Sequence, residues 1–278
     1  LDPGDVVLVE LPTYIGGTAS FYARSARLEG VAQDDGGVVI DALDDVAART
    51  RPKLVYTIPN FQNPSGRLMA QDRRRKLLEL AAKHDFLIIE DDPYGELVYV
   101  EGADTTPMKA HDEADRVIYL GSFSKVLAPG LRCGWIVAPP ALASRFEIAK
   151  QAADLCSGML DQSIVDEFLA SGELPAQIAR VRDFYRGKRG VLISALEKHF
   201  AGRASWTSAD GGLFSFVTFE EGVDTGARIE EAVRRGVAYI PGAPFFVDGS
   251  GANTMRLTFA KESDENIAEG VKRLSFVF

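Results

Sequence analysis

The sequence predicts an α/β protein with a mostly parallel open sheet, helices on both faces of it, and a smaller C-terminal α+β domain. Three observations predict this fold. In the first half, short and nearly continuous apolar runs alternate with helical segments, which is typical of β-α-β units. After about residue 138 the pattern changes to successive helices, one of them long enough to link two domains. Beyond that helix, strands and helices are mixed on a smaller scale.

Five apolar runs in the first half are predicted as buried strands. Their near-continuous hydrophobicity favours parallel pairing with both faces covered. The runs are residues 6–10, 54–59, 86–91, 117–123 and 133–138. A helix is predicted over 70–85, because Leu77, Leu80 and Ala81 are spaced to form one buried face.

The second half is predicted to begin with two helices, in PALASRFEIAKQAADL and QSIVDEFLA. A long helix then starts at Pro175 and runs to Phe200, since proline suits the first turn and apolar residues recur at helical spacing. A strand (211–219), a helix (225–236), two strands in VAYIPG and TMRLTFA, and a closing helix in DENIAEGVKRL follow. We therefore expect a large domain over 1–174 and a small one over 175–278.

Composition argues against several classes of function. The formal net charge of −9 and the lack of a basic run argue against a nucleic-acid-binding surface. No apolar stretch is long enough for a membrane span. Cys133 and Cys156 are read as small buried residues, and His84, His111 and His199 show no metal-ligand spacing. A cytoplasmic location fits this composition. The opening LDPGD, with no initiator methionine or targeting segment, suggests that the sequence begins within a longer protein.

One segment, GSFSKVLAPGLRCGW (121–135), places Lys125 in a turn rich in glycine, serine and proline between two apolar strands. Ser122 and Ser124, which carry hydroxyl groups, precede the lysine in the sequence, and Arg132 follows it. A lysine in such a turn, taken alone, is more often solvated than catalytic. However, strand ends of an α/β sheet are where ligands usually bind. An amine, hydroxyls and a guanidinium together suit an anionic ligand.

Other polar residues follow apolar strands in the same way. Asp91 and Asp92 end one strand, although aspartate also caps helices. Asn63, in NFQNPSG, precedes a proline that favours a turn, and Tyr14 follows the first strand. Arg256 lies inside the apolar strand MRLTF, where a guanidinium needs an anionic partner. A bound ligand is favoured over a structural ion pair as that partner.

Together these segments resemble the class I/II aminotransferases, which are pyridoxal-phosphate enzymes of fold type I. The segments PNFQNPSG, EDDPYGEL and SFSKVLAPGLRCGW carry the resemblance, which extends over the whole chain in the family's order. It is close to the branch of 2-aminoadipate, kynurenine and broad-specificity aromatic aminotransferases. The resemblance implies pyridoxal 5'-phosphate as cofactor, and amino transfer from an L-amino acid to a 2-oxo acid, with 2-oxoglutarate the expected acceptor. It also implies a homodimer with active sites at the subunit boundary.

The resemblance assigns the residues of the lysine turn. The lysine matching Lys125 is joined covalently to the cofactor aldehyde and later moves the proton between the substrate Cα and the cofactor C4′. Lysine can do both when its surroundings favour the neutral amine. Ser122, Ser124 and Arg132 match the positions that hold the cofactor phosphate.

The remaining site residues are assigned in the same way. Asp91, three residues before Tyr94, matches the aspartate that pairs with the pyridine nitrogen. Asn63 and Tyr94 match the pair that binds the 3-oxygen of the ring, and Tyr14 matches the aromatic residue that stacks on it. Arg256 matches the arginine that binds the substrate α-carboxylate, with help from Asn63. Lys125, Asp91 and Tyr94 are thus the expected catalytic residues, and Asp92 the structural neighbour of Asp91.

Family members carry a further phosphate-binding segment, a first strand and an N-terminal region upstream of LDPGD, so a missing N-terminal part is expected. Two alternative functions remain at this stage. The first is an aminotransferase-like ligand-sensing domain of a winged-helix transcription regulator. The second is a lyase or decarboxylase on the same fold, which an arginine clamping the carboxylate disfavours. Specificity is weakly encoded, since Phe214, Phe245 and Phe246 suit either an apolar pocket or the core.

Overall fold

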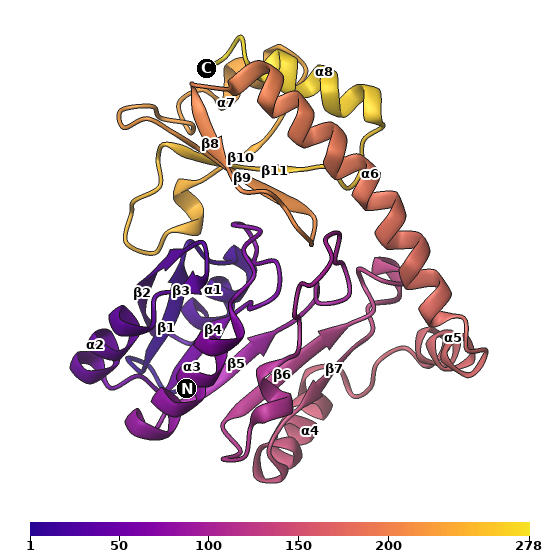
Figure 1. Cartoon of the computed structure of the whole chain (residues 1–278). Coiled ribbons are helices and arrows are strands. Elements are labelled where there is room, and N and C mark those ends of the chain that lie inside the picture. The colour runs from indigo at the N-terminus through magenta and orange to yellow at the C-terminus, as the bar shows by residue number, and fades with distance from the viewer.

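The computed structural model describes residues 1–278, which form two sheets joined by a long helix (Figure 1). The larger sheet has the strand order β3-β2-β1-β4-β5-β6-β7, and the smaller has the order β10-β11-β9-β8. The elements of the larger sheet's half are β1 (Val6–Leu11), α1 (Ile15–Tyr22), β2 (Arg27–Asp34), β3 (Gly37–Val38), α2 (Ile40–Thr50), β4 (Leu54–Thr57), α3 (Gln71–His84), β5 (Leu87–Asp91), the 3-10 turn η1 (Met108–His111), β6 (Val117–Ser122), η2 (Pro129–Leu131), β7 (Gly134–Val137), α4 (Pro140–Asp154) and α5 (Met159–Ala170). The rest are α6 (Leu174–Phe200), β8 (Ala204–Trp206), β9 (Phe214–Phe219), α7 (Ile229–Arg234), β10 (Ile240–Pro241), η3 (Ala243–Phe245), β11 (Thr254–Thr258) and α8 (Asp264–Leu274).

The centre of the larger sheet is parallel. Strand β1 pairs in parallel with β2 on one side and with β4 on the other, and β4, β5 and β6 continue in the same direction. The chain thus reverses its direction of winding between β1 and β4. In open α/β sheets, the carboxyl ends of the strands at such a point form the crevice where ligands bind.

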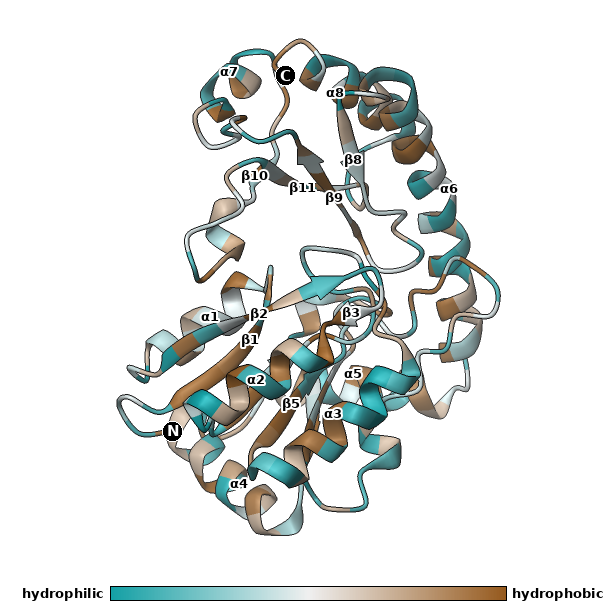
Figure 2. Cartoon of the chain, turned by 60° about the vertical axis from the view of Figure 1, so that its left-hand side comes forward, coloured by the Kyte–Doolittle hydropathy of each residue, from teal (hydrophilic) through white to brown (hydrophobic).

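Helices cover both faces of this sheet, which confirms the predicted fold class. Helices α2 and α3 bury Leu43, Leu77 and Leu80 against the face that carries Leu8 and Ile88. Helix α1 packs on the opposite face. Figure 2 shows the apolar strands behind α2 and α3, whose outer surfaces are hydrophilic. None of the helices combines the length and apolarity needed to cross a membrane.

The prediction for residues 133–138 was wrong in two respects. Strand β7 pairs antiparallel with β6, and it forms the edge of the sheet. Its residues are exposed, among them Trp135 (41%) and Ile136 (52%). An apolar run does not distinguish a central strand from an edge strand, because hydrophobicity reports composition and not the neighbours of the strand.

Other differences concern short or polar elements. Strand β2 has a mixed sequence, RLEGVAQD, and was not predicted, nor were β3, β8, α1 and α2. Helix α7 covers only Ile229–Arg234 of the predicted 225–236. The predicted helices beginning near residue 70, at Pro175 and in DENIAEGVKRL are confirmed as α3, α6 and α8.

The smaller sheet lies between the larger sheet and a pair of helices, α6 and α8 (Figure 1). Side chains alternate along β9, so Val217 and Phe219 are buried in the core that Leu192 and Leu196 of α6 share. The half of the molecule that contains the larger sheet contacts the half that contains the smaller one. The hydroxyl of Tyr99, which follows β5, donates to the backbone carbonyl of Gly212, which precedes β9, at 2.5 Å. The other face of the smaller sheet is thereby held opposite the strand ends of the larger one.

Candidate active site

Predicted site residues gather at the carboxyl edge of the larger sheet. Tyr14 follows β1, Asn63 follows β4, Asp91 is the last residue of β5, and Ser122 is the last residue of β6. Strands β5 and β6 are direct neighbours, with Asp91 opposite Leu120 in the register. The turn that carries the predicted lysine therefore begins one strand away from Asp91.

Arg256 of β11 connects the two sheets. Its Nη1 donates a hydrogen bond of 2.7 Å to Oδ1 of Asn63, a residue 193 positions earlier. The guanidinium carbon lies 4.2 Å from the ring centre of Phe214 and 5.2 Å from that of Phe245. Burial lowers the pKa of Arg256, no acidic side chain pairs with it, and its buried Nε has no partner. A desolvated guanidinium without a carboxylate is ready to bind an anionic ligand.

The turn that carries Asn63 is rigid. The carbonyl oxygen of the Gln62 side chain accepts from the Ser65 backbone N–H (2.9 Å), and the Gln62 amide donates to the carbonyl of Pro12 (2.6 Å). Gly66 has φ +71°, and a Cβ there would lie 2.8 Å from a carbonyl of β9, which requires glycine. Residues 60–66 are all buried. The position of Asn63 is therefore fixed by contacts within the protein itself.

The two aspartates at the end of β5, Asp91 in the strand and Asp92 directly after it, differ in their surroundings. Asp92 is fully engaged, because it accepts from the Asn60 amide (3.0 Å), the Gly95 backbone N–H (2.9 Å) and the Tyr119 hydroxyl (3.2 Å). Asp91 accepts one hydrogen bond, from the Tyr56 hydroxyl at 2.6 Å. Burial raises the pKa of Asp91, Tyr56 lowers it, and the charge of Asp92 raises it further. Asp91 thus keeps an oxygen for a cationic partner, whereas Asp92 holds loops together.

Two tyrosines border this group. Tyr94 is buried and packs edge-to-face on Phe214, with ring centres 5.9 Å apart. Burial raises the pKa of Tyr94 far above its usual range, Asp91 raises it further, and Arg256 and Asn63 oppose the rise. Tyr14 is 39% exposed. An exposed ring at a strand end offers a flat apolar surface to a ligand.

The lysine turn forms a second cluster. Oγ of Ser122 accepts from the backbone N–H of Ser124 at 3.0 Å. Arg132 has a left-handed backbone (φ +52°), and its side chain donates to the carbonyl of Pro129 at 3.2 Å. Partial burial lowers the pKa of Lys125, and the positive charge of Arg132 lowers it further. The cluster is cationic and has no acidic partner.

The structure places these two groups beside each other without a direct bond. No hydrogen bond joins Ser122, Ser124, Lys125 or Arg132 to the group around Asp91. Their proximity follows from the adjacency of β5 and β6. A ligand with an anionic end and a cationic or polar ring would bridge the space between the clusters.

Two further residues were not predicted from the sequence. Tyr56 lies in the apolar run LVYT of β4 and was treated as core. Glu10 is the single acidic residue in the apolar strand β1, a signal that would have identified it. It is buried, and it accepts from Thr57 (2.9 Å), the Ile58 backbone N–H (3.2 Å) and Gln62 (3.2 Å). Burial raises the pKa of Glu10 to about 7.

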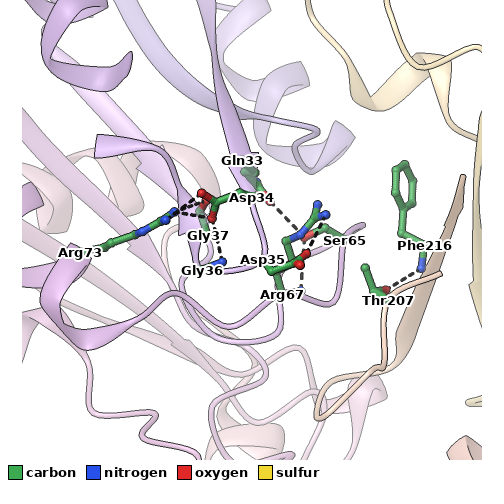
Figure 3. Close-up of polar contacts among 10 residues, drawn as sticks. All are labelled: Gln33, Asp34, Asp35, Gly36, Gly37, Ser65, Arg67, Arg73, Thr207 and Phe216. Atoms are coloured by element: carbon green, nitrogen blue, oxygen red, sulfur yellow. Dashed lines mark hydrogen bonds and ion pairs between the residues drawn. The ribbon is translucent and has the colours of Figure 1, made fainter. Parts of the chain in front are cut away.

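A separate cavity of about 940 Å³ lies between the two sheets, and none of the predicted site residues lines it. Its walls include Asp35 and Arg67 from the larger sheet's loops and Thr207 and Phe216 from the smaller sheet. Figure 3 shows Arg67 beside Asp35, and Thr207 accepting from the backbone N–H of Phe216. A nitrogen of the Arg67 guanidinium lies 3.4 Å from an Asp35 carboxylate oxygen. Of the phenylalanines considered for a pocket, Phe246 lines this cavity, while Phe214 and Phe245 flank Arg256.

Comparison with known proteins identifies the family. The family model described as "Aminotransferase class I and II" matches residues 1–274. The chain belongs to this aminotransferase family. It is 44% identical to the aromatic-amino-acid aminotransferase 1 of Thermococcus litoralis, over 99% of this chain and 67% of the relative. It is 39% identical to the 2-aminoadipate transaminase of Thermus thermophilus, over 99% and 69%.

A solved structure agrees with this assignment. The crystal structure of Pyrococcus horikoshii kynurenine aminotransferase, described as a complex with PMP, superposes with a TM-score of 0.97 at 41% identity, covering 100% of this chain and 70% of that one. The aminotransferase is also 33% identical to an uncharacterised HTH-type transcriptional regulator of Bacillus subtilis, over 96% of this chain but 54% of the relative. The predicted family, its fold and its class of enzyme are confirmed.

The cofactor of the aminotransferase is pyridoxal 5'-phosphate, and the residues present fit it. Arg132 supplies a positive charge with no acidic partner, which suits a phosphate dianion, and Lys125 supplies an amine with a lowered pKa, which suits an aldehyde. Asp91 supplies a partly buried carboxylate with one oxygen unpaired by protein, which suits a protonated ring nitrogen. Tyr14 supplies an exposed ring for stacking. Each part of the cofactor has a matching group in the site.

Proposed function

We propose that this aminotransferase moves the amino group of an L-amino acid with an aromatic, aliphatic or 2-aminoadipate-like side chain to a 2-oxo acid, with 2-oxoglutarate as the acceptor. The observation that carries the proposal is the unpaired guanidinium of Arg256, fixed by Asn63 between two aromatic rings. Every amino acid and every 2-oxo acid presents a carboxylate next to the reacting carbon. A bidentate arginine contact would orient that carbon.

The remaining groups would act on the reacting atoms. When bound, pyridoxal phosphate supplies an electron-accepting ring that stabilises negative charge at the substrate Cα. Lys125 would take the proton from that Cα, because its lowered pKa leaves more of the amine neutral at a given pH. Asp91 would hold the proton on the ring nitrogen, so that the ring keeps its positive charge.

The cofactor would be held at its edges by the other predicted residues. Ser122, Ser124 and Arg132 would bind the phosphate, and Asn63 and Tyr94 the 3-oxygen of the ring, with Tyr14 stacked on its face. The assignment of Tyr94 is supported by its electrostatic interactions with Asp91 and Arg256, and that of Tyr14 by its exposed ring after β1. Arg256 lies on β11 of the smaller sheet and Asn63 in the turn after β4 of the larger one, so the substrate carboxylate would bind where the two halves of the molecule meet.

We further propose the division into a large domain (1–174) and a small domain (175–278), because each range contains one sheet and α6 joins them. A homodimer with active sites at the subunit boundary is proposed on the basis of apolar side chains exposed on α4 and α5, including Ile148 (60%) and Leu160 (74%). A net charge of −9 supports a protein that does not bind nucleic acid, and we propose a cytoplasmic location for it.

The alternative function is a ligand-sensing domain, which the similarity to a transcriptional regulator supports. A turnover assay separates the two proposals. The protein is loaded with pyridoxal phosphate and incubated with 2-oxoglutarate and a panel of amino acids, and glutamate is measured. Multiple turnovers with at least one donor would support the enzyme. Spectral changes on amino-acid binding without glutamate release would contradict it and support the sensor.

A further inference from the structure

Tyr56 occupies a position beneath the site that the predicted set of residues does not include. Its hydroxyl donates to Oδ2 of Asp91 at 2.6 Å, and this is the single protein hydrogen bond that Asp91 accepts. The ring is 3% exposed and lies on β4, the strand beside β5. Tyr56 therefore fixes one carboxylate oxygen of Asp91 and leaves Oδ1 without a protein partner.

The ring of Tyr56 is itself held in place. Phe21 of α1 packs against it edge-to-face, with ring centres 5.6 Å apart. Gly17, also on α1, provides space for the ring, because a Cβ at that position would lie 2.7 Å from it. Strand β4, which carries Tyr56, pairs with β1 on one side and with β5 on the other. The hydroxyl is thus held against Asp91 by the protein's own packing, which limits the reorganisation that the site needs.

The electrostatics of the pair agree with this role. Burial and the neighbouring charge of Asp92 raise the pKa of Asp91, and the hydrogen bond from Tyr56 lowers it. Burial raises the pKa of Tyr56 well above its usual range, and the carboxylates of Asp91 and Glu10 and the phenol of Tyr14 raise it further. Tyr56 stays a proton donor, and its donation favours the ionised carboxylate that a cationic ring nitrogen needs.

We propose that Tyr56 is a positioning residue that orients the Asp91 carboxylate toward the cofactor's ring nitrogen and keeps it ionised. This inference rests on the proposed role of Asp91. Tyr56 does not touch the reacting atoms and acts through Asp91. The chain offers a matched control, because Tyr119 donates in the same way to the adjacent Asp92, at 3.2 Å.

The test compares Tyr56→Phe with Tyr119→Phe. Both variants lose one hydroxyl and keep the ring, so the packing of each is retained. In the cofactor-free protein with 13C-labelled aspartate carboxyls, Tyr56→Phe should raise the pKa of Asp91, measured by NMR titration. In the loaded enzyme, kcat/KM should fall about tenfold, as expected for a hydrogen bond to a charged group, and its acid limb should move to higher pH. Tyr119→Phe should leave both the Asp91 pKa and the acid limb unchanged.

A double-mutant cycle makes the test sharper. If Tyr56 acts through Asp91, then Tyr56→Phe should have little further effect in an Asp91→Asn background. Full additivity, an unmoved Asp91 pKa, or an equal shift in Tyr119→Phe would each overturn the positioning role. These results leave the parent's turnover intact, so they are distinguishable from failure of the proposed function. A parent that takes up no cofactor would overturn both proposals.

Discussion

Replacing Arg256 with alanine should reduce kcat/KM for every amino-acid donor by about two orders of magnitude. The guanidinium can offer N–H groups of both terminal nitrogens to a carboxylate, because Nη1 gives only one of its two N–H groups to Asn63 and Nη2 has no hydrogen-bond partner. Each charge-assisted hydrogen bond is worth about 1.5–3 kcal/mol. Two bonds at the lower end give about 3 kcal/mol, which corresponds to a loss of about 150-fold. The loss should fall mainly on KM, since the carboxylate is bound in the ground state as well as in the transition state.

The assay measures steady-state kinetics with several donors, together with the cofactor content of each preparation. Arg256→Lys keeps the charge but loses the planar fork, so an intermediate loss of about tenfold is expected. Arg203→Ala serves as a control, because Arg203 also packs over a ring (Phe200, 5.6 Å) but lies on the exposed surface. Unchanged kcat/KM in a well-folded, cofactor-loaded Arg256→Ala variant would refute the assignment of Arg256 to the substrate carboxylate.

Three other predictions concern charge. Asp91→Asn should lower turnover more than tenfold with less effect on cofactor affinity, because the phosphate contacts remain; equal turnover in variant and parent would contradict its role. Arg132→Ala should raise the pKa of Lys125, so capture of pyridoxal by the cofactor-free protein, followed by absorbance, should need a higher pH, whereas an unchanged profile would show that the charge of Arg132 does not act on Lys125. Burial raises the pKa of Glu10 from an ordinary 4.5 to about 7 in the folded protein, so between these pH values the folded state retains a proton that the unfolded state has lost. The free energy of unfolding should therefore fall as the pH rises from 4.5 to 7, by up to about 3 kcal/mol. Glu10→Gln should reduce that fall in urea unfolding at pH 5 and pH 8, without removing it, because Glu90 also has a pKa of about 7; an unchanged difference would contradict the raised pKa.

The parallel centre of the larger sheet could be predicted because its strands are buried on both faces and are therefore almost purely apolar. Strand β2 could not, since only Val31 among its eight residues is buried. The antiparallel direction and the exposure of β7 were missed for the opposite reason. Its residues are apolar although they are exposed, and no local pattern reports which strand lies beside another.

Some features of the candidate site could be predicted from the sequence, and others depend on the tertiary arrangement. Asn63, Asp91 and Ser122 lie at or just after strand ends, so chain order and parallel pairing place them at one edge. The pairing of Arg256 with Asn63 joins residues 193 positions apart, and it depends on how the two sheets face each other. Tyr56 was missed because a tyrosine in an apolar strand is ordinarily core, and only the register of β4 against β5 brings its hydroxyl to Asp91.

The central claim is that Lys125 is the residue joined to pyridoxal phosphate. The most direct measurement is borohydride reduction of the cofactor-loaded protein, followed by proteolysis and mass-spectrometric mapping of the modified peptide. We predict a single stoichiometric adduct on Lys125 and none in Lys125→Ala, which should also lose nearly all turnover because the reaction needs this amine twice. An adduct on another lysine, or a loaded and active protein with Lys125 unmodified, would contradict the account.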